Sequence, residues 1–188
     1  APIDAKALEQ YSVFSKLGFY GVQSETSRGA ADFLRVSRSV LAAPNTAIWL
    51  TPEGRFADPR DHEASLMPGL SHLCQTMKRG TVLPIAMEYA FWDERLPVCL
   101  TLQGQAIRVT EFSQLSKAQW NDLLTDQLRQ AQNKLGELAI ARSSEPFDDL
   151  LSGKRGAGGL YDFMRRMKAG LTGRTFQAEH GKQFADRA

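Results

Sequence analysis

The residues with the clearest chemical potential form a short polar block that follows an apolar run. The run Thr46–Thr51 carries no charge, and Pro52, Glu53, Gly54 and Arg55 come directly after it. An arginine guanidinium offers a bidentate fork to phosphate, and a glycine lets backbone amides come close to the same group. Ligands of open α/β sheets bind at the carboxyl ends of the strands. The block therefore predicts a ligand-binding loop, with an ordinary surface turn as the alternative.

The remaining reactive residue types do not fall into patterns that support metal or cofactor chemistry. His62 does not begin a zinc-binding HExxH helix, because Leu66 stands where the second histidine belongs. Cys74 and Cys99 have no metal-ligand spacing, so we expect two buried thiols. The stretch 153–159 lacks the lysine of a phosphate loop and the third glycine of a dinucleotide fingerprint. We expect neither a metal nor a cofactor.

Composition places the chain among folded globular domains. Its 188 residues are 43% hydrophobic and 23% charged, which excludes a disordered, collagen-like or disulfide-dense protein. The longest uncharged stretch, 39–52, is too short to span a bilayer. The first residue is not Met, and the opening stretch lacks the apolar core of a signal peptide, so we expect a matured, cleaved or trimmed chain.

Charge is distributed unevenly along the chain. Residues 1–150 hold 15 Lys/Arg and 18 Asp/Glu, net −3, whereas residues 151–188 hold 8 and 3, net +5. Basic blocks of this kind contact nucleic acid or anionic lipid. We therefore predict a main domain over residues 1–145 and a basic, glycine-containing extension over residues 146–188.

The elements that must position the polar block alternate between helices and strands. Apolar spacing and Gly or Pro stops predict helices over 5–16, 27–41, 69–79 and 117–142, with a short one ending at Lys168. Strands are predicted over 19–23, 46–51, 81–89 and 98–103, of which 46–51 has the near-continuous apolar run of a strand covered on both faces. The alternation predicts an α/β layered domain with a largely parallel central sheet flanked by helices.

Four blocks, in this order and spacing, resemble the lysophospholipid acyltransferase family, which includes the 1-acylglycerol-3-phosphate acyltransferases. The blocks are 14–22 (FSKLGFYGV), 52–55 (PEGR), 67–69 (MPG) and 82–86 (VLPIA). The resemblance covers residues 5 to about 107, and the run 147–181 is similar to the tail of some bacterial members. It implies a glycerolphosphate acyltransferase-like fold.

The resemblance also implies roles for particular residues. Glu53–Arg55 and the block that contains Gly21 would bind the phosphate of the acceptor, while Val82 and Pro84 would lie near the acyl donor. The implied reaction transfers a fatty acyl group from acyl-CoA or acyl-carrier protein to a lysophospholipid such as 1-acylglycerol-3-phosphate, in phospholipid biosynthesis. The implied location is the cytoplasmic face of a membrane, peripherally bound to an anionic surface, with no nucleic acid as partner.

The sequence departs from the family pattern at three places. No threonine separates Gly54 from Arg55, and Arg28 is the nearest basic residue to the usual arginine of the second block, with a helix-surface role as the alternative. The family's His-x-x-x-x-Asp pair, in which His deprotonates the acceptor hydroxyl and Asp orients the imidazole, is absent. We expect that the chain begins downstream of this pair and therefore lacks its catalytic residues.

Two function classes compete with the enzyme. The first is a non-catalytic lipid-binding relative that keeps the phosphate site without the His-Asp pair. The second is nucleic-acid binding through the basic tail, which is weaker because Tyr161 and Phe163 share one predicted helix. That helix either rests in lipid headgroups or packs in a core with a solvated basic face.

Overall fold

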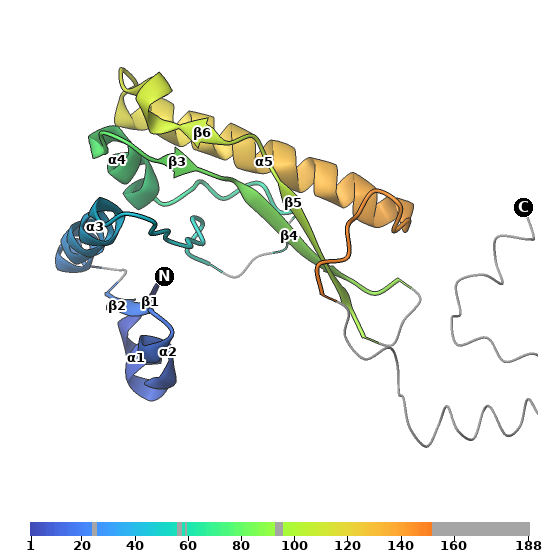
Figure 1. Cartoon of the computed structure of the whole chain (residues 1–188), viewed down its shortest axis with the longest axis horizontal. Coiled ribbons are helices and arrows are strands. Elements are labelled where there is room, and N and C mark those ends of the chain that lie inside the picture. The colour runs from blue at the N-terminus through green and yellow to red at the C-terminus, as the bar shows by residue number, and fades with distance from the viewer. Residues whose placement is uncertain (24–25, 56–57, 59, 93–95, 152–188) are drawn as a thin grey trace, which may run out of the picture. The chain divides into compact units, whose positions relative to one another are not determined.

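The computed structural model describes residues 1–23, 26–55, 58, 60–92 and 96–151, and it has mixed α/β content (Figure 1). The described strands form three sheets of two strands each. The chain divides into two compact units. Unit 1 comprises Ala1–Ile85 and Gln103–Ala131, and the described part of unit 2 comprises Ala86–Leu102 and residues 132–151.

The N-terminal part of unit 1 holds a small parallel sheet and two short helices. Strand β1 (Pro2–Asp4) pairs in parallel with β2 (Tyr20–Val22), and β2 lies within the strand predicted over 19–23. The single helix predicted over 5–16 is instead divided into α1 (Ala5–Gln10) and α2 (Val13–Lys16). The Asp4 carboxylate caps α1 by accepting hydrogen bonds from two backbone amides of its first turn.

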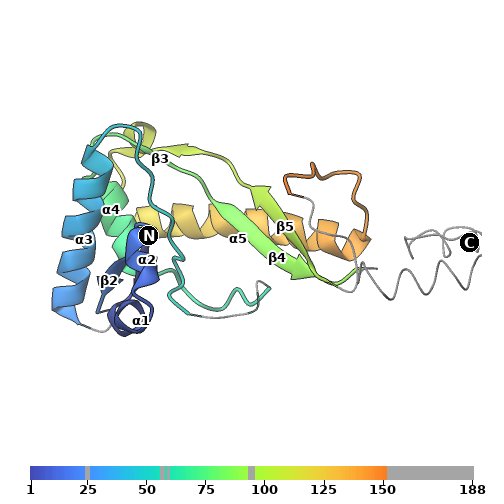
Figure 2. The same cartoon turned by 60° about the horizontal axis from the view of Figure 1, so that its bottom comes forward.

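The next two helices of unit 1 lie side by side in Figures 1 and 2. Helix α3 (Ser27–Ala42) begins where the helix over 27–41 was predicted to begin, and the Thr26 hydroxyl caps it by accepting a hydrogen bond of 2.9 Å from the Gly29 amide. Helix α4 (Pro68–Thr76) has a proline in its first turn, where no amide partner is lost. A Cβ atom on Gly69 would lie 2.9 Å from the Phe33 ring, so a larger residue where α4 meets α3 would require that ring to shift.

The core of unit 1 forms where α4 and α5 (Lys117–Ala141) pack against a short antiparallel sheet. Strand β3 (Thr81–Val82) pairs with β6 (Ile107–Arg108), and the 3-10 helix η1 (Val109–Phe112) follows. Helix α5 begins at the predicted residue: Ser116 and Gln119 exchange side chain to backbone hydrogen bonds in a capping box. The buried cluster comprises Leu66, Cys74, Ile107, Val109, Trp120 and Leu124.

The described part of unit 2 is built on β4 (Ile85–Ala90) and β5 (Val98–Gln103), which pair in one sheet. The indole of Trp92 donates a hydrogen bond of 3.0 Å to the Ala139 carbonyl and packs on Phe147 at 6.2 Å between ring centroids. From residue 152 onward, the basic extension lies outside the described residues. The short helix predicted to end at Lys168 lies in this part.

The two cysteines differ, although both were expected to be buried. Cys74 is 1% exposed, and burial raises the pKa of its thiol to about 12. Cys99 is exposed, because side chains along β5 alternate between a covered and a solvent face, and Cys99 falls on the solvent face. The expectation of a buried thiol is therefore wrong for Cys99.

The largest difference from the predicted fold concerns Thr46–Thr51, which is not a strand in the structure. We expected the strand to be covered on both faces, but the side chain of Trp49 is 54% exposed. Within the described residues, the backbone groups of 47–50 have no hydrogen-bond partner, so the segment lacks the neighbouring strand that would define it as one. Strands β1 and β2 form a parallel pair and β3 and β6 an antiparallel pair, and each described sheet has two strands, so the described residues form no largely parallel central sheet.

Over the ranges that the structure describes, no helix combines the length and apolar character that a bilayer span requires.

Candidate functional site

The polar block Glu53–Arg55 opens a loop whose two ends meet. The Met67 amide donates a hydrogen bond of 2.7 Å to the Pro52 carbonyl, and the Gly54 amide donates one of 3.2 Å to the Thr51 carbonyl. Gly54 has φ +66°, a left-handed conformation that favours glycine. The block therefore forms a tight turn at the start of a closed loop, which agrees with a surface position in unit 1.

Glu53 is held by an arginine on helix α5. The Arg129 guanidinium donates from Nη1 to Glu53 Oε1 at 2.5 Å, and from Nη2 to the Ala64 carbonyl at 2.7 Å. The side chains of Arg129 and Glu53 are only 10% and 15% exposed. A buried charge pair of this kind depends on both partners, since removal of one leaves the other without compensation. Glu53 is thus engaged in positioning the loop.

Arg55 is held within the same loop, at its surface. Its Nη2 donates to Asp61 Oδ2 at 2.7 Å, and the two side chains are 43% and 34% exposed. The pKa of Asp61 is lowered, first by this hydrogen bond and then by one from the Glu63 amide. Exposed pairs of this kind contribute little to stability. A phosphate can therefore compete with the Asp61 carboxylate for the guanidinium of Arg55.

An apolar cavity of about 700 Å³ lies next to this loop within unit 1. One wall is the extended segment 46–50 with Pro52, and another is the stretch 80–85. Leu70, Leu73, Leu124 and Leu128 close it from the helices. Among the described lining residues, Arg79 is the one that carries a charge. The cavity therefore suits an apolar chain with an anionic group at its edge.

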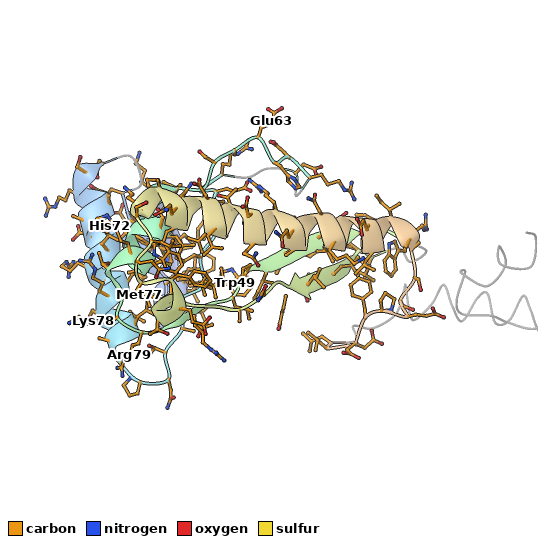
Figure 3. The ribbon with its side chains drawn as sticks, turned by 90° about the horizontal axis from the view of Figure 1, so that it is seen from above. Trp49, Glu63, His72, Met77, Lys78 and Arg79 are labelled. Atoms are coloured by element: carbon orange, nitrogen blue, oxygen red, sulfur yellow. The ribbon has the colours of Figure 1, made fainter. Side chains whose placement is uncertain are left out.

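Labelled side chains in Figure 3 locate the cavity and the loop relative to each other. Trp49 and Met77, which both line the cavity, lie close to α5, and Lys78 and Arg79 follow at the end of α4. Glu63 lies at the outer edge of the loop and points away from the rest of the chain.

The structure brings together some of the predicted site residues and separates others. Val82 and Pro84 line the same cavity as Pro52, so two of the sequence blocks meet there. Gly21 lies in β2, where it pairs with Ile3, and it does not line the cavity. Arg28 is exposed in the first turn of α3 and does not line it either. The helix-surface alternative for Arg28 fits this position.

Arg129 is a site residue that the sequence did not indicate. It follows Trp120 by nine residues, which is two and a half helical turns, so it lies on the opposite side of α5 from the apolar stripe. An arginine there is expected to be solvated. It is 9% exposed because the loop covers it, and its partners Glu53 and Ala64 are far away in sequence. No local pattern links these residues.

The described residues hold no group of His, Cys, Asp and Glu side chains suited to a metal ion. The Nε2 atom of His62 is buried, and it has no hydrogen-bond partner in the part of the chain that the structure describes. Comparison with protein-family models, with curated proteins and with solved structures finds no match for this chain.

Proposed function

We propose that this protein transfers a fatty acyl group from acyl-CoA or acyl-carrier protein to a lysophospholipid such as 1-acylglycerol-3-phosphate, in phospholipid biosynthesis. The proposal combines the resemblance of the four sequence blocks to the lysophospholipid acyltransferases with one structural observation. The observation is that Pro52 lines the apolar cavity while Arg55 follows three residues later on the same loop.

This arrangement fits an amphiphilic acceptor. Its phosphate would take the place of the Asp61 carboxylate on Arg55, and its acyl chain would enter the cavity. The stretch from Val82 to Pro84, on the other wall, is suited to the acyl chain of the donor because its side chains line the same cavity. Gly21 and Arg28 do not line the cavity, so we give them no part in holding the acyl chain of the acceptor.

The proposed reaction needs no covalent intermediate. The acceptor hydroxyl oxygen attacks the thioester carbonyl carbon, a general base takes the hydroxyl proton, the carbon–sulfur bond breaks, and the carrier leaves as a thiol. We propose that a His-x-x-x-x-Asp pair upstream of Ala1 supplies the base. None of the three histidines here has an aspartate five residues later: Met67, Met77 and Ala185 stand at those positions.

The proposal also includes the layered sheet of the acyltransferase fold. We propose that the layered, largely parallel sheet of the acyltransferases includes Thr46–Thr51 as a strand once a neighbouring strand lies beside it. The segment is apolar and extended, and the backbone of 47–50 has no partner among the described residues, which supports this role.

We further propose a peripheral location at the cytoplasmic face of a membrane. The support is the basic composition of residues 151–188, because each Lys or Arg near an anionic lipid surface contributes about 1 kcal/mol of attraction. Removal of these residues is expected to lower sedimentation with anionic vesicles, most of all at low salt. Unchanged sedimentation at every salt concentration would argue against this location.

The acceptor site is tested by titrating the chain with a short-chain 1-acylglycerol-3-phosphate below its micelle concentration. Arg55→Ala is expected to weaken binding by about 1.5–3 kcal/mol, the value of a hydrogen bond to a charged group. Arg28→Ala is the matched control, since its guanidinium is exposed on α3, and it is expected to bind like wild type. Equal affinities for all three proteins would refute the assignment of the phosphate to Arg55.

Thioester consumption separates the enzyme from the lipid-binding relative. We expect no turnover from the 188-residue chain and turnover from a version extended upstream through the His-Asp pair, because positioned acid–base catalysis contributes about 10²–10⁴-fold. Binding without turnover in both versions would favour the lipid-binding relative. Turnover by the short chain would contradict the upstream base and direct attention to His62, whose Nε2 is buried without a partner in the described residues.

A further inference from the structure

We propose that Arg129 is a positioning residue that sets the reach of Arg55 by tying the two ends of the segment 53–64 together. The inference rests on the proposed function, because it takes Arg55 as the phosphate ligand. It adds a residue outside the four sequence blocks, on helix α5, 76 residues after Glu53 and 65 after Ala64.

The contact geometry uses both terminal nitrogens of one planar group. Nη1 binds the Glu53 carboxylate at 2.5 Å and Nη2 binds the Ala64 carbonyl at 2.7 Å. Because the guanidinium is rigid, the two acceptors are held at a fixed separation. A lysine ammonium at this position is a point charge on a flexible stem, so it cannot reproduce both directions at once.

The other described side-chain contacts of the loop are exposed. Between Gly54 and Ser65, each described residue is exposed or half-buried. The Arg55–Asp61 pair lies inside the segment that Arg129 closes, and it is exposed. The described contact that ties this segment to the body of unit 1 through a buried charge is the one made by Arg129.

The position of Arg55 follows from this contact. Arg55 is two residues from Glu53, and the intervening Gly54 is in a left-handed turn. When Glu53 is held, the direction in which the chain leaves the turn is held as well. The Met67–Pro52 hydrogen bond closes the chain just outside this segment, but without the Arg129 contact no side chain holds Glu53 and Ala64, so Arg55 samples positions other than the one beside Asp61.

The test compares Arg129→Met, Arg129→Lys and a matched control, Arg35→Met. Arg35 forms an exposed ion pair with Asp32 at 3.0 Å on α3, so its loss is expected to change neither the fold nor the loop. Each protein is titrated with short-chain 1-acylglycerol-3-phosphate, and hydrogen exchange is measured for the amides of 53–64. Far-UV circular dichroism verifies that each variant is folded.

We expect Arg129→Met to weaken binding by about tenfold or more, as when a hydrogen bond to a charged group is lost, and to speed exchange across 53–64. Arg129→Lys is expected to fall between Arg129→Met and wild type, and Arg35→Met to match wild type. If a folded Arg129→Met binds like wild type, the proposal is overturned. If Arg129→Met does not fold, wild-type affinity of Arg129→Lys overturns it in the same way.

Failure of the proposed function has a different signature. Wild type that does not bind the lysophospholipid refutes the acceptor site itself, whatever the variants do. In that case hydrogen exchange still decides whether Arg129 positions the loop: wild-type exchange rates across 53–64 in Arg129→Met and Arg129→Lys overturn the positioning role. Faster exchange in both variants, with Arg35→Met unchanged, supports it.

Discussion

Replacement of Gly54 by alanine is expected to destabilise the protein through the turn that begins the loop. At φ +66°, a residue with a Cβ atom costs about 1–2 kcal/mol relative to the right-handed region. The added Cβ would also lie 2.2 Å from the Met67 sulfur. Met67 is 42% exposed and flexible, so it can move aside at a cost of about 0.5–1.5 kcal/mol.

Alanine also restricts the unfolded chain, which offsets about 0.4–1 kcal/mol of this cost. The net loss in the free energy of unfolding is therefore about 0.5–3 kcal/mol, or roughly 1–12 °C in Tm for a chain of this size. The matched control is Gly136→Ala, since a Cβ at Gly136 in helix α5 meets no atom within 4 Å. This substitution is expected to stabilise by about 0.5–1 kcal/mol.

Urea denaturation followed by tryptophan fluorescence measures both changes, with the buried Trp120 as the reporter of unit 1. The double variant Gly54→Ala/Met67→Ala separates the two causes: it removes the steric part of the loss and leaves the part due to the left-handed backbone. If Gly54→Ala is as stable as wild type while Gly136→Ala is more stable, the turn does not require glycine and the reasoning is refuted.

Two further predictions concern the thiols and the start of α3. At pH 8 a disulfide reagent is expected to modify Cys99 in the folded chain and Cys74 only after denaturation, because burial raises the pKa of Cys74 to about 12; rapid reaction of both would contradict the burial. Thr26→Ala is expected to lower the free energy of unfolding by about 1 kcal/mol through loss of the cap on α3. In that case Thr26→Ser, which keeps the hydroxyl, should recover most of the loss in a thermal melt.

The parts of the fold that the sequence predicted well are those specified by local chemistry. Helix α3 begins where the Thr26 hydroxyl can cap it, and α5 begins at the Ser116–Gln119 box. Strand β5 matches its predicted bounds. Thr46–Thr51 differs because a strand also needs a neighbour, which an apolar run cannot specify by itself.

In the candidate site, too, local sequence features were predictable and contacts between distant residues were not. The block Glu53–Arg55 was found from residue types, and its loop position agrees with the prediction. Its two ion partners were not found, because Asp61 belongs to a generally acidic stretch and Arg129 lies on the polar side of α5. Pairing between residues distant in sequence depends on how loops cover helices, and one sequence does not encode that in any local pattern.

The extended segment Thr46–Thr51 also bears on how the protein behaves in solution. It offers six residues without charge or proline, three of them Ile48, Trp49 and Leu50, and its backbone groups at 47–50 are unpaired in the described structure. Such an exposed edge is a template on which another chain can add a strand. This segment is expected to lower solubility at high concentration more than it affects thermal stability, and Thr51→Lys, at an exposed side chain that does not line the cavity, is expected to raise solubility.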